Sequence, residues 1–319
     1  MNIKKIIILI RRITQLLSFM NKLILTGATG FLGKNILSVL NKSNFEVTTL
    51  GNPTTNIVCD ISIEIPKFPH SFDLVVHAAG KAHSVPKNKS EEKVFFDVNL
   101  NGTHNLLKGF ENSNMLPKAF VFISSVAVYG CESGTMINEN HPLNAKDAYG
   151  LSKIQAEQLI QNWCAKNNVI CTILRLPLLV GKNPPGNLGA MIRGIEKGYY
   201  FNIGGGKAKK SMVFAKDVAK IIPDASKSGG IYNLTDGYHP SFAELASTIA
   251  KTINKKRIFN LPLWVANIMA RLGDLLGNKS PINSRKLAKI MADLTFDDTK
   301  AKKELNWKPS PVLQGFKIK

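Results

Sequence analysis

The sequence predicts an α/β fold in which a doubly wound parallel sheet is joined to a smaller, mostly helical C-terminal region. Up to residue 175, short apolar runs typical of buried strands alternate with stretches of helical periodicity, which is the pattern of βαβ units. After Arg175 the character of the chain changes, because Pro and Gly crowd the stretch 177–189. We therefore assign 20–175 to a sheet-containing domain and 176–319 to a second region, some of whose segments return to the sheet.

The strands and helices follow from these runs. In the first domain we expect strands at 22–26, 45–50, 73–78, 119–124 and 169–175, and helices at 31–41, 91–112 and 148–167. In the second region we expect a turn and a strand at 229–234 and a helix at 241–254. Because Pro262, Arg271 and Asp274 interrupt the mostly apolar stretch 258–277, we interpret it as a packed helix pair rather than a membrane span.

Length, composition and net charge limit the classes of protein to which this chain can belong. With 319 residues, of which 44% are hydrophobic, the chain can bury a full core. A formal net charge of +20 would suit nucleic acid or an anionic membrane surface, but the lysines are scattered along the whole chain. We interpret the charge as a composition bias that still attracts an anionic nucleotide, and we expect no nucleic-acid partner.

Cysteine and histidine spacing gives no metal signal. The four cysteines form no CxxC pair, and the six histidines form neither HxxxH nor HExxH, so we expect no metal site. Free thiols in a chain with a large core are typical of a reducing cytosol, and we predict a cytoplasmic protein. The cysteines are Cys59, Cys131, Cys164 and Cys171.

Residues 1–19 are basic and apolar, and their apolar run is too short to span a bilayer. They lack the long apolar core and the Ala-x-Ala site of a signal peptide. We interpret them as an upstream extension, because residues 20–24 look like the natural start of a first strand. A basic amphipathic helix at a membrane surface is the alternative.

A glycine-rich turn of the pattern GxxGxxG occupies 27–33, between the first strand and the first helix. Gly27 permits a tight turn, Gly30 lets the backbone approach a pyrophosphate, and Gly33 lets helix and strand pack closely. The helix N-terminus adds free N–H groups and the positive end of its dipole. This context predicts a dinucleotide-binding Rossmann domain.

The position after the second strand usually separates NAD from NADP. A carboxylate there binds the ribose hydroxyls of NAD and repels the extra phosphate of NADP. This chain has Gly51 and Asn52 in that place, with neither an acid nor a nearby Arg. We expect NAD as the cofactor, and the sequence leaves NADP open.

Four further polar residues, Asn99, Ser125, Tyr149 and Lys153, predict redox chemistry at a carbon that bears oxygen. Tyr149 and Lys153 are spaced i, i+4, so they share a helix face and lie about 5–6 Å apart. A free tyrosine has a pKa of about 10, which a neighbouring cation lowers, so Tyr149 can take a proton from a substrate hydroxyl. Ser125 can hydrogen-bond the same oxygen.

The blocks that hold these residues resemble, in this order, the extended short-chain dehydrogenase/reductase family. The resemblance covers 20 to about 310 and rests on the motifs GATGFLG, HAAG, SSVAVYG, YGLSK and a tail ELNWKP. It implies that Ser125, Tyr149, Lys153 and Asn99 are catalytic. The cofactor-binding residues that it implies are Gly27, Thr29, Gly30, Phe31, Leu32, Gly33, Asp60, Ile61, His77, Ala78, Ala79, Gly80, Asn99, Tyr149, Lys153 and Pro177. His77 as a structural strand-end residue and Asn99 as a helix bridge are the alternatives.

Within that family the chain is most similar to nucleotide-sugar epimerases of the NAD-dependent epimerase/dehydratase branch. The similarity implies substrate-binding roles for Ser125, Tyr149, Asn187, Leu188 and Lys210. Lys210 stands where the family usually has a pyrophosphate-binding Arg, and it is a weaker bidentate match. Dehydratases of the family carry an Asp-Glu pair directly after the active Ser or Thr, whereas this chain has Val126 and Ala127, so dehydration is not expected.

The expected reaction is NAD(P)-dependent C4 epimerisation of a UDP-hexose or UDP-N-acetylhexosamine through a 4-keto intermediate. One alternative is an NAD(P)H-dependent 4-keto reductase of a nucleotide-linked deoxysugar, which would use the same four residues. A non-catalytic nucleotide-sensing protein is the alternative from another class, and the intact Ser125, Tyr149 and Lys153 argue against it. We expect a nucleotide-sugar partner and no integral membrane span, and we leave a homodimer open.

Overall fold

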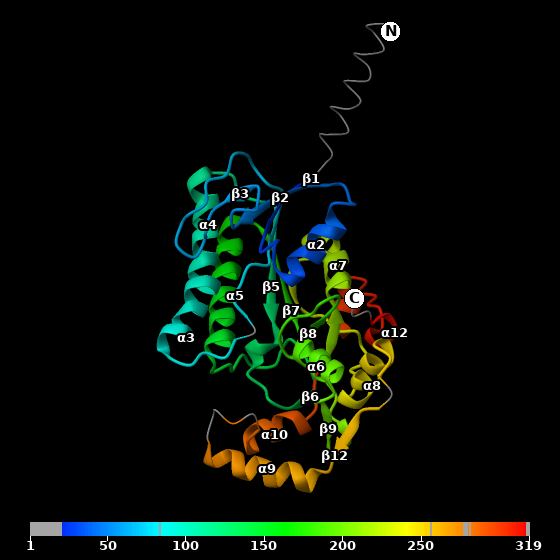
Figure 1. The fold of residues 1–319 in the computed structure, drawn as a ribbon. Coiled ribbons are helices and arrows are strands. Elements are labelled where there is room, and N and C mark those ends of the chain that lie inside the picture. The colour runs from blue at the N-terminus through cyan, green and yellow to red at the C-terminus, as the bar shows by residue number, and fades with distance from the viewer. Residues whose placement is uncertain (1–20, 83, 256, 277–279, 281, 317–319) are drawn as a thin grey trace, which may run out of the picture.

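The computed structural model describes residues 21–82, 84–255, 257–276, 280 and 282–316. The extension expected at 1–19 lies outside them. Figure 1 shows a large α/β unit and a smaller lid at its lower edge, which contains mostly elements from the later part of the chain.

One sheet of seven parallel strands forms the centre of the large unit. Its order is β3-β2-β1-β4-β5-β7-β11, so the winding reverses between β1 and β4. The strands are β1 (Asn21–Thr26), β2 (Phe45–Gly51), β3 (Ile57–Val58), β4 (Leu74–His77), β5 (Ala119–Ser125), β7 (Ile170–Leu176) and β11 (Gly230–Asn233). The doubly wound fold is therefore confirmed, and ligands of such sheets bind at the carboxyl edge, where the order reverses.

Helices cover both faces of the sheet. One face carries α2 (Phe31–Leu40) and α7 (Ala215–Ser228), and the other carries α4 (Gly102–Ser113) and α5 (Ala148–Asn167). Along β1, Leu23 and Leu25 belong to the core under α2, whereas Ile24 belongs to the core under α4 and α5. Because all three side chains are fully buried, the strand appears in the sequence as an unbroken apolar run rather than an alternating one.

The helix predicted at 91–112 is confirmed in extent, since the chain is helical from 89 to 113, but the sequence does not predict the π turn within it. The structure has α3 (Lys89–Phe96), a π-helical turn (Asp97–Asn101) and then α4. Asn99 lies in that turn and is buried, and its side chain accepts from Lys81 N at 2.7 Å and donates to Ser152 Oγ at 2.9 Å. A π turn inserts one extra residue into a helix, and apolar periodicity does not reveal a single inserted residue.

The lid consists of four helices and pairs of short parallel strands. The helices are α6 (Gly186–Lys197), α8 (Phe242–Thr252), α9 (Leu263–Leu275) and α10 (Ser284–Met291). The strand pairs are β8 (Leu178–Val180) with β10 (Met212–Phe214), β9 (Phe201–Ile203) with β12 (Phe259–Leu261), and β6 (Gly134–Ile137) with β13 (Leu294–Phe296). The helix pair predicted at 258–277 is wrong, because Pro262 separates the strand β12 from the single helix α9, which packs on α10 instead.

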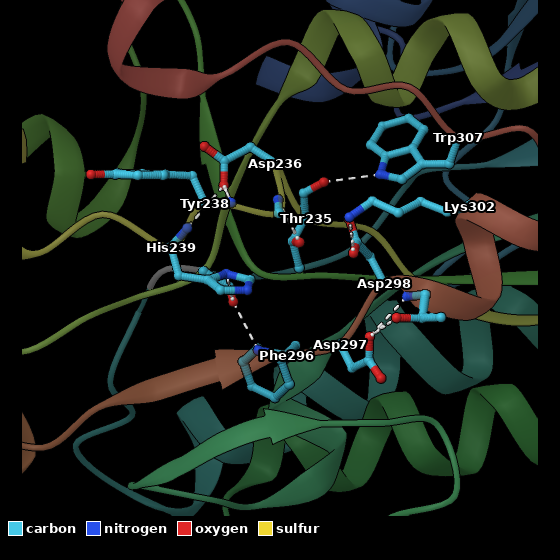
Figure 2. Close-up of polar contacts among 12 residues, drawn as sticks. Thr235, Asp236, Tyr238, His239, Phe296, Asp297, Asp298, Lys302 and Trp307 are labelled. Carbon is cyan, nitrogen blue, oxygen red and sulfur yellow. Dashed lines mark hydrogen bonds and ion pairs between the residues drawn. The ribbon is translucent and has the colours of Figure 1, made fainter.

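The C-terminal tail is tied to the loop that follows β11. After α11 (Thr299–Glu304), the indole N–H of Trp307 donates to the carbonyl oxygen of Thr235 at 2.9 Å. Lys302 pairs with the buried carboxylate of Asp298 at 2.7 Å. Figure 2 shows both contacts in one cluster: the ion pair lies within α11 and its N-cap, whereas the hydrogen bond of Trp307 joins the tail to the loop after β11.

Candidate functional site

The glycine turn joins β1 to α2 at the carboxyl edge of the sheet. Gly27 has φ +71°, and a Cβ there would lie 2.6 Å from Ala79 N, so glycine lets the segment after β4 approach. A Cβ on Gly33 would collide with the carbonyl oxygen of Gly27. Gly30 is the N-cap of α2 and has no side chain to occupy the N–H groups of residues 31–33. The turn therefore fits the pyrophosphate of a dinucleotide.

Substitutions in the glycine turn can distinguish a glycine that close packing requires from one that leaves room for a ligand. Gly33→Ala is expected to lower the free energy of unfolding by about 1–3 kcal/mol, because a backbone carbonyl blocks the new methyl group. Gly30→Ala, whose Cβ would lie 3.3 Å from Gly27 O, is the matched control and is expected to cost less than about 1 kcal/mol. Urea unfolding of both variants measures the difference, and equal stability of the two would contradict this account of the turn.

The ribose end of the predicted cofactor site lies after β2 and β3. The Asn52 side chain follows β2 and donates from Nδ2 to the hydroxyl of Thr29 in the glycine turn at 3.3 Å. Asp60 is exposed and accepts from the hydroxyl of Ser62 at 2.6 Å, while Ile61 beside it is buried. The side chain after β2 that contacts the turn is thus the neutral amide of Asn52, in the place where a carboxylate would select NAD.

His77 at the end of β4 is structural. Its Nδ1 contacts the Thr26 hydroxyl at 2.6 Å, and its Nε2 contacts the Thr103 hydroxyl at 2.9 Å. Complete burial lowers the pKa of His77 to about 3, so the ring is neutral near pH 7. Both nitrogens are occupied, so any role in cofactor binding falls to the backbone that continues to Gly80.

Asn99 and Lys153 meet at Gly80. A Cβ on Gly80 would lie 3.0 Å from Asn99 Oδ1 and 3.2 Å from Lys153 Nζ, so glycine is what leaves room for both groups. Lys153 Nζ donates to the carbonyl oxygen of Ile123 at 2.9 Å and lies 4.5 Å from the centre of the Phe122 ring. Burial lowers the pKa of Lys153 to about 8, so most of the side chain stays protonated at pH 7.

Ser125 and Tyr149 lie at the ends of neighbouring elements. Ser125 is the last residue of β5, and its Oγ accepts from Ala127 N at 3.2 Å. Tyr149 lies in the first turn of α5, whose N-cap is Asp147. Burial is the largest influence on Tyr149 and raises its pKa, while a hydrogen bond from Ser125 opposes that rise. The pKa of Tyr149 is thus raised where the sequence predicts a lowered one, because burial disfavours the phenolate and the carboxylate of Asp147 adds to the rise.

A buried ion pair supports this site, and the sequence analysis missed it. Glu157, one turn after Lys153 on α5, binds Arg175 of β7 through Oε2 at 2.7 Å and Oε1 at 3.1 Å. Glu157 also accepts from the hydroxyl of Ser124, next to Ser125. Arg175 further donates to the Tyr129 hydroxyl at 3.1 Å. An arginine at the end of an apolar strand was the signal, since a buried Arg requires a carboxylate partner.

The predicted substrate residues lie on the lid side. Asn187 is exposed and Leu188 is buried, both in the first turn of α6, so Leu188 can offer only its backbone N–H. Lys210 Nζ donates to the carbonyl oxygens of Lys289 at 3.2 Å and Ala292 at 2.8 Å, at the C-terminal end of α10. Lys210 thus caps a helix, and its contact with a pyrophosphate stays a prediction, as do the roles of Pro177 after β7 and of Asn187 and Leu188.

Within the described residues, no group of three or more His, Cys, Asp or Glu side chains could hold a metal ion. Among the helices of those same residues, none has both the length and the apolar character to cross a membrane.

Fold and site together define a dinucleotide-binding α/β protein with a Ser-Tyr-Lys arrangement at the carboxyl edge of its sheet. The profile of the "NAD dependent epimerase/dehydratase family" matches residues 23–234. Since that match covers more than half of the sequence, the chain belongs to this family, whose cofactor is NAD.

Two curated relatives match over nearly the whole chain. A UDP-glucose 4-epimerase of Vibrio cholerae is 29% identical and covers 92% of this chain and 93% of its own. An N-acetyl-alpha-D-glucosaminyl-diphospho-ditrans,octacis-undecaprenol 4-epimerase of Escherichia coli O157:H7 is 27% identical and covers 93% of each. The crystal structure of UDP-glucose 4-epimerase from Thermotoga maritima with UDP-glucose has a TM-score of 0.70 at 18% identity, over 92% of this chain and 96% of that one.

Proposed function

We propose that this protein is an NAD-dependent 4-epimerase of a nucleotide sugar, a UDP-hexose or a UDP-N-acetylhexosamine. The observation that supports it is the convergence of Ser125, Tyr149 and Lys153 with the glycine turn at one edge of the sheet. Residues Val126 and Ala127 form a 3-10 turn after the serine, and neither can serve as the acid or base that dehydration needs. The 4-epimerases among the relatives support the same reaction.

The reaction divides between the cofactor and this chain's own side chains. Bound NAD supplies the acceptor and donor of the hydride at the sugar C4. Tyr149, as the phenolate, takes the proton of the 4-hydroxyl, and Ser125 donates a hydrogen bond to the same oxygen. After the 4-keto sugar turns over, Tyr149 returns the proton as the opposite face is reduced. The buried ammonium of Lys153 favours the anionic tyrosine in the deprotonation step.

The experiment separates epimerase from reductase. Purified protein incubated with UDP-glucose or UDP-N-acetylglucosamine is expected to form the C4 epimer without net change in NADH absorbance. Denaturation should release stoichiometric NAD. Net NADPH consumption with a 4-keto deoxysugar nucleotide, together with no epimer from either UDP-sugar, would establish the reductase instead.

Cofactor preference provides a second test at Asn52. Asn52→Asp places a carboxylate beside Thr29, where it binds ribose hydroxyls and repels a 2′-phosphate, so the ratio of NAD to NADP affinity should rise at least ~10-fold. Asn114→Asp, an exposed change at the C-cap of α4, is the control and should leave the ratio unchanged. Titration of both cofactors measures it, and an unchanged ratio in Asn52→Asp would place the ribose elsewhere.

A sugar carried on a polyprenyl diphosphate is the second candidate substrate. The observation that favours it is an outward-facing apolar helix in the lid, α9, on which Trp264, Ile268 and Leu272 are exposed. The Escherichia coli relative is named for such a substrate. Assaying the same preparation with UDP-N-acetylglucosamine and with a short-chain polyprenyl diphosphate sugar decides between the two by relative kcat/KM.

We also propose that the enzyme is cytoplasmic. Light scattering during size-exclusion chromatography would determine whether it is a monomer or a homodimer. Neither affects the assignment of Tyr149.

A further inference from the structure

In helix α9 the small residues are buried and the large apolar residues are exposed, which is the opposite of the usual arrangement. Its buried residues are Ala266, Ala270 and Gly273, and Gly273 lies so close to the carbonyl of Ile282 that a Cβ would collide with it. A helix at the surface of a globular protein normally turns its large apolar residues inward and its polar ones outward. In α9 a narrow stripe of small residues faces the protein, so the helix is held tightly while its large side chains face away.

The outward side of α9 is a broad apolar surface. Its large apolar residues are 42–84% exposed: Leu263, Trp264, Ile268, Met269, Leu272, Leu275 and the C-cap Leu276. At 3.6 residues per turn, those from Trp264 to Leu276 spread over an arc of about 140°, on the side away from the buried stripe. Large exposed apolar residues that gather on one helix mark an interaction surface, whereas isolated ones need no explanation.

Exposed aromatic side chains also lie on the strands β9 and β12, whose Ile203 and Leu261 pack against the buried residues of α9. Phe201 of β9 and Phe259 of β12 are exposed, and their ring centres lie 6.5 Å apart. Tyr199, just before β9, is 60% exposed. Figure 1 shows α9 as the outer edge of the lid, with α10 on its inner side.

Basic residues predominate in the part of the chain that contains α9. In the sequence, the stretch 251–292 has nine basic residues and one acidic residue, Asp274. Asp274 stays charged, because hydrogen bonds from Ser284 lower its pKa, and the stretch still has an excess of positive charge. Arg271 lies on α9 at the edge of the apolar arc and is exposed, as are Arg257 and Lys289 nearby in the chain. This combination of apolar arc and basic border is that of a helix that lies in the plane of a membrane interface.

We propose that the outward face of α9 binds the surface of an anionic lipid bilayer. Trp264, Ile268 and Leu272 enter the boundary between headgroups and acyl chains, where aromatic and aliphatic side chains are favoured. The basic border binds the anionic headgroups. A second copy of this chain is a poorer occupant, because a two-fold pairing of the face would bring the same basic residues together. The inference goes beyond the proposed reaction and does not depend on it.

Vesicle co-sedimentation of the full chain tests the proposal. Wild-type protein is expected to sediment with vesicles of phosphatidylcholine and phosphatidylglycerol, and at least ~10-fold less with phosphatidylcholine alone. Ile268→Gln/Leu272→Gln should lower the partition coefficient on the anionic vesicles at least ~10-fold. The matched control is Ile63→Gln/Val85→Gln, which changes two exposed apolar residues of the Rossmann domain and should bind like the wild type.

Three outcomes would overturn the proposal. Equal sedimentation of the α9 variant and the wild type would place any membrane contact elsewhere in the chain, and no sedimentation of the wild type would remove the contact altogether. A wild-type dimer that Ile268→Gln/Leu272→Gln converts to a monomer would make the face a self-interface. Epimerase activity of the same variants on a soluble UDP-sugar is a separate readout, so failure of the proposed reaction is distinguished from failure of membrane binding.

Raising the salt tests the basic border. From about 0.1 M to about 1 M ionic strength the Debye length falls from about 10 Å to about 3 Å, so binding to anionic vesicles should weaken several-fold. Arg257→Gln/Arg271→Gln should weaken binding at low salt and remove most of its salt dependence. An unchanged salt dependence in that variant would overturn the assignment of these two arginines to the border.

Discussion

Tyr149→Phe is expected to reduce epimerase turnover roughly 10²–10⁴-fold, because the ring stays in place while the group that transfers the proton is lost. Binding of the nucleotide sugar should survive, since the predicted binding residues Asn187 and Leu188 lie on α6. Ser125→Ala should cost less, because Ser125 hydrogen-bonds the oxygen and does not take the proton. Steady-state kcat and a separately measured Kd separate turnover from binding.

The control for this experiment is another tyrosine hydroxyl. Tyr238→Phe removes an exposed hydroxyl that donates to Glu244 at 2.5 Å in the lid, and activity should remain at the wild-type level. A Tyr149→Phe enzyme with near wild-type turnover on any UDP-sugar would refute the assignment of Tyr149 as base and remove the main support for the proposed reaction.

The pH–rate profile gives a further signature of the same residue. Burial raises the pKa of Tyr149, so the phenolate is scarce at neutral pH and its population increases as pH rises. If Tyr149 is the base, kcat/KM therefore rises with pH up to that pKa. Lys153→Met removes the buried cation and should move this limb to higher pH. A profile that is flat in the wild type between pH 6 and 9 would contradict the role.

The elements that the sequence predicted well are those in which local residues decide the outcome. The strand at 22–26 and the turn at 27–33 are fixed by an apolar run and by glycines whose Cβ atoms have no room, and both signals lie within a few neighbouring residues. Burial on both faces of the sheet explains why β1, β4 and β5 appear as continuous apolar runs.

The features that the sequence missed depend on distant contacts. The π turn at Asn99 meets Lys81 and Ser152, 18 and 53 residues away, and neither distance leaves a periodic pattern. The raised pKa of Tyr149 follows from burial by the whole fold rather than from the i, i+4 spacing to Lys153. The helix pair predicted at 258–277 is wrong because residues 259–261 pair as a strand with residues 201–203 of β9, a partner that lies far away in the sequence.

Removal of the carboxylate at Glu157 is expected to be the most destabilising single change tested. Glu157 and Arg175 are both almost completely buried, with side-chain exposures of 0% and 3%. Two charges in such an environment are tolerable only as a pair, and breaking a buried pair from one side costs about 3–5 kcal/mol. Glu157→Gln should therefore lower the free energy of unfolding by about that amount, because the guanidinium of Arg175 stays buried without an opposite charge.

The double variant and a surface pair make the test specific. Glu157→Gln/Arg175→Met removes both charges and should be less destabilised than Glu157→Gln. If the two sites were independent, the losses in the free energy of unfolding would add and the double variant would be the less stable one. Lys118→Gln breaks the exposed pair with Asp73, at 2.8 Å, and should destabilise the protein much less than Glu157→Gln does. Urea unfolding provides all three values, and a loss below about 1 kcal/mol in Glu157→Gln would show that the pair does not hold α5 to β7.

The same variant carries a prediction for the site. The Glu157 carboxylate raises the pKa of Lys153, partly offsetting the burial that lowers it to about 8. Without that carboxylate the pKa of Lys153 falls further, so less of the ammonium remains at pH 7 to favour the phenolate of Tyr149. In Glu157→Gln the activity of the folded fraction should thus fall more at pH 8 than at pH 6, whereas loss through unfolding alone would leave the shape of the pH profile unchanged.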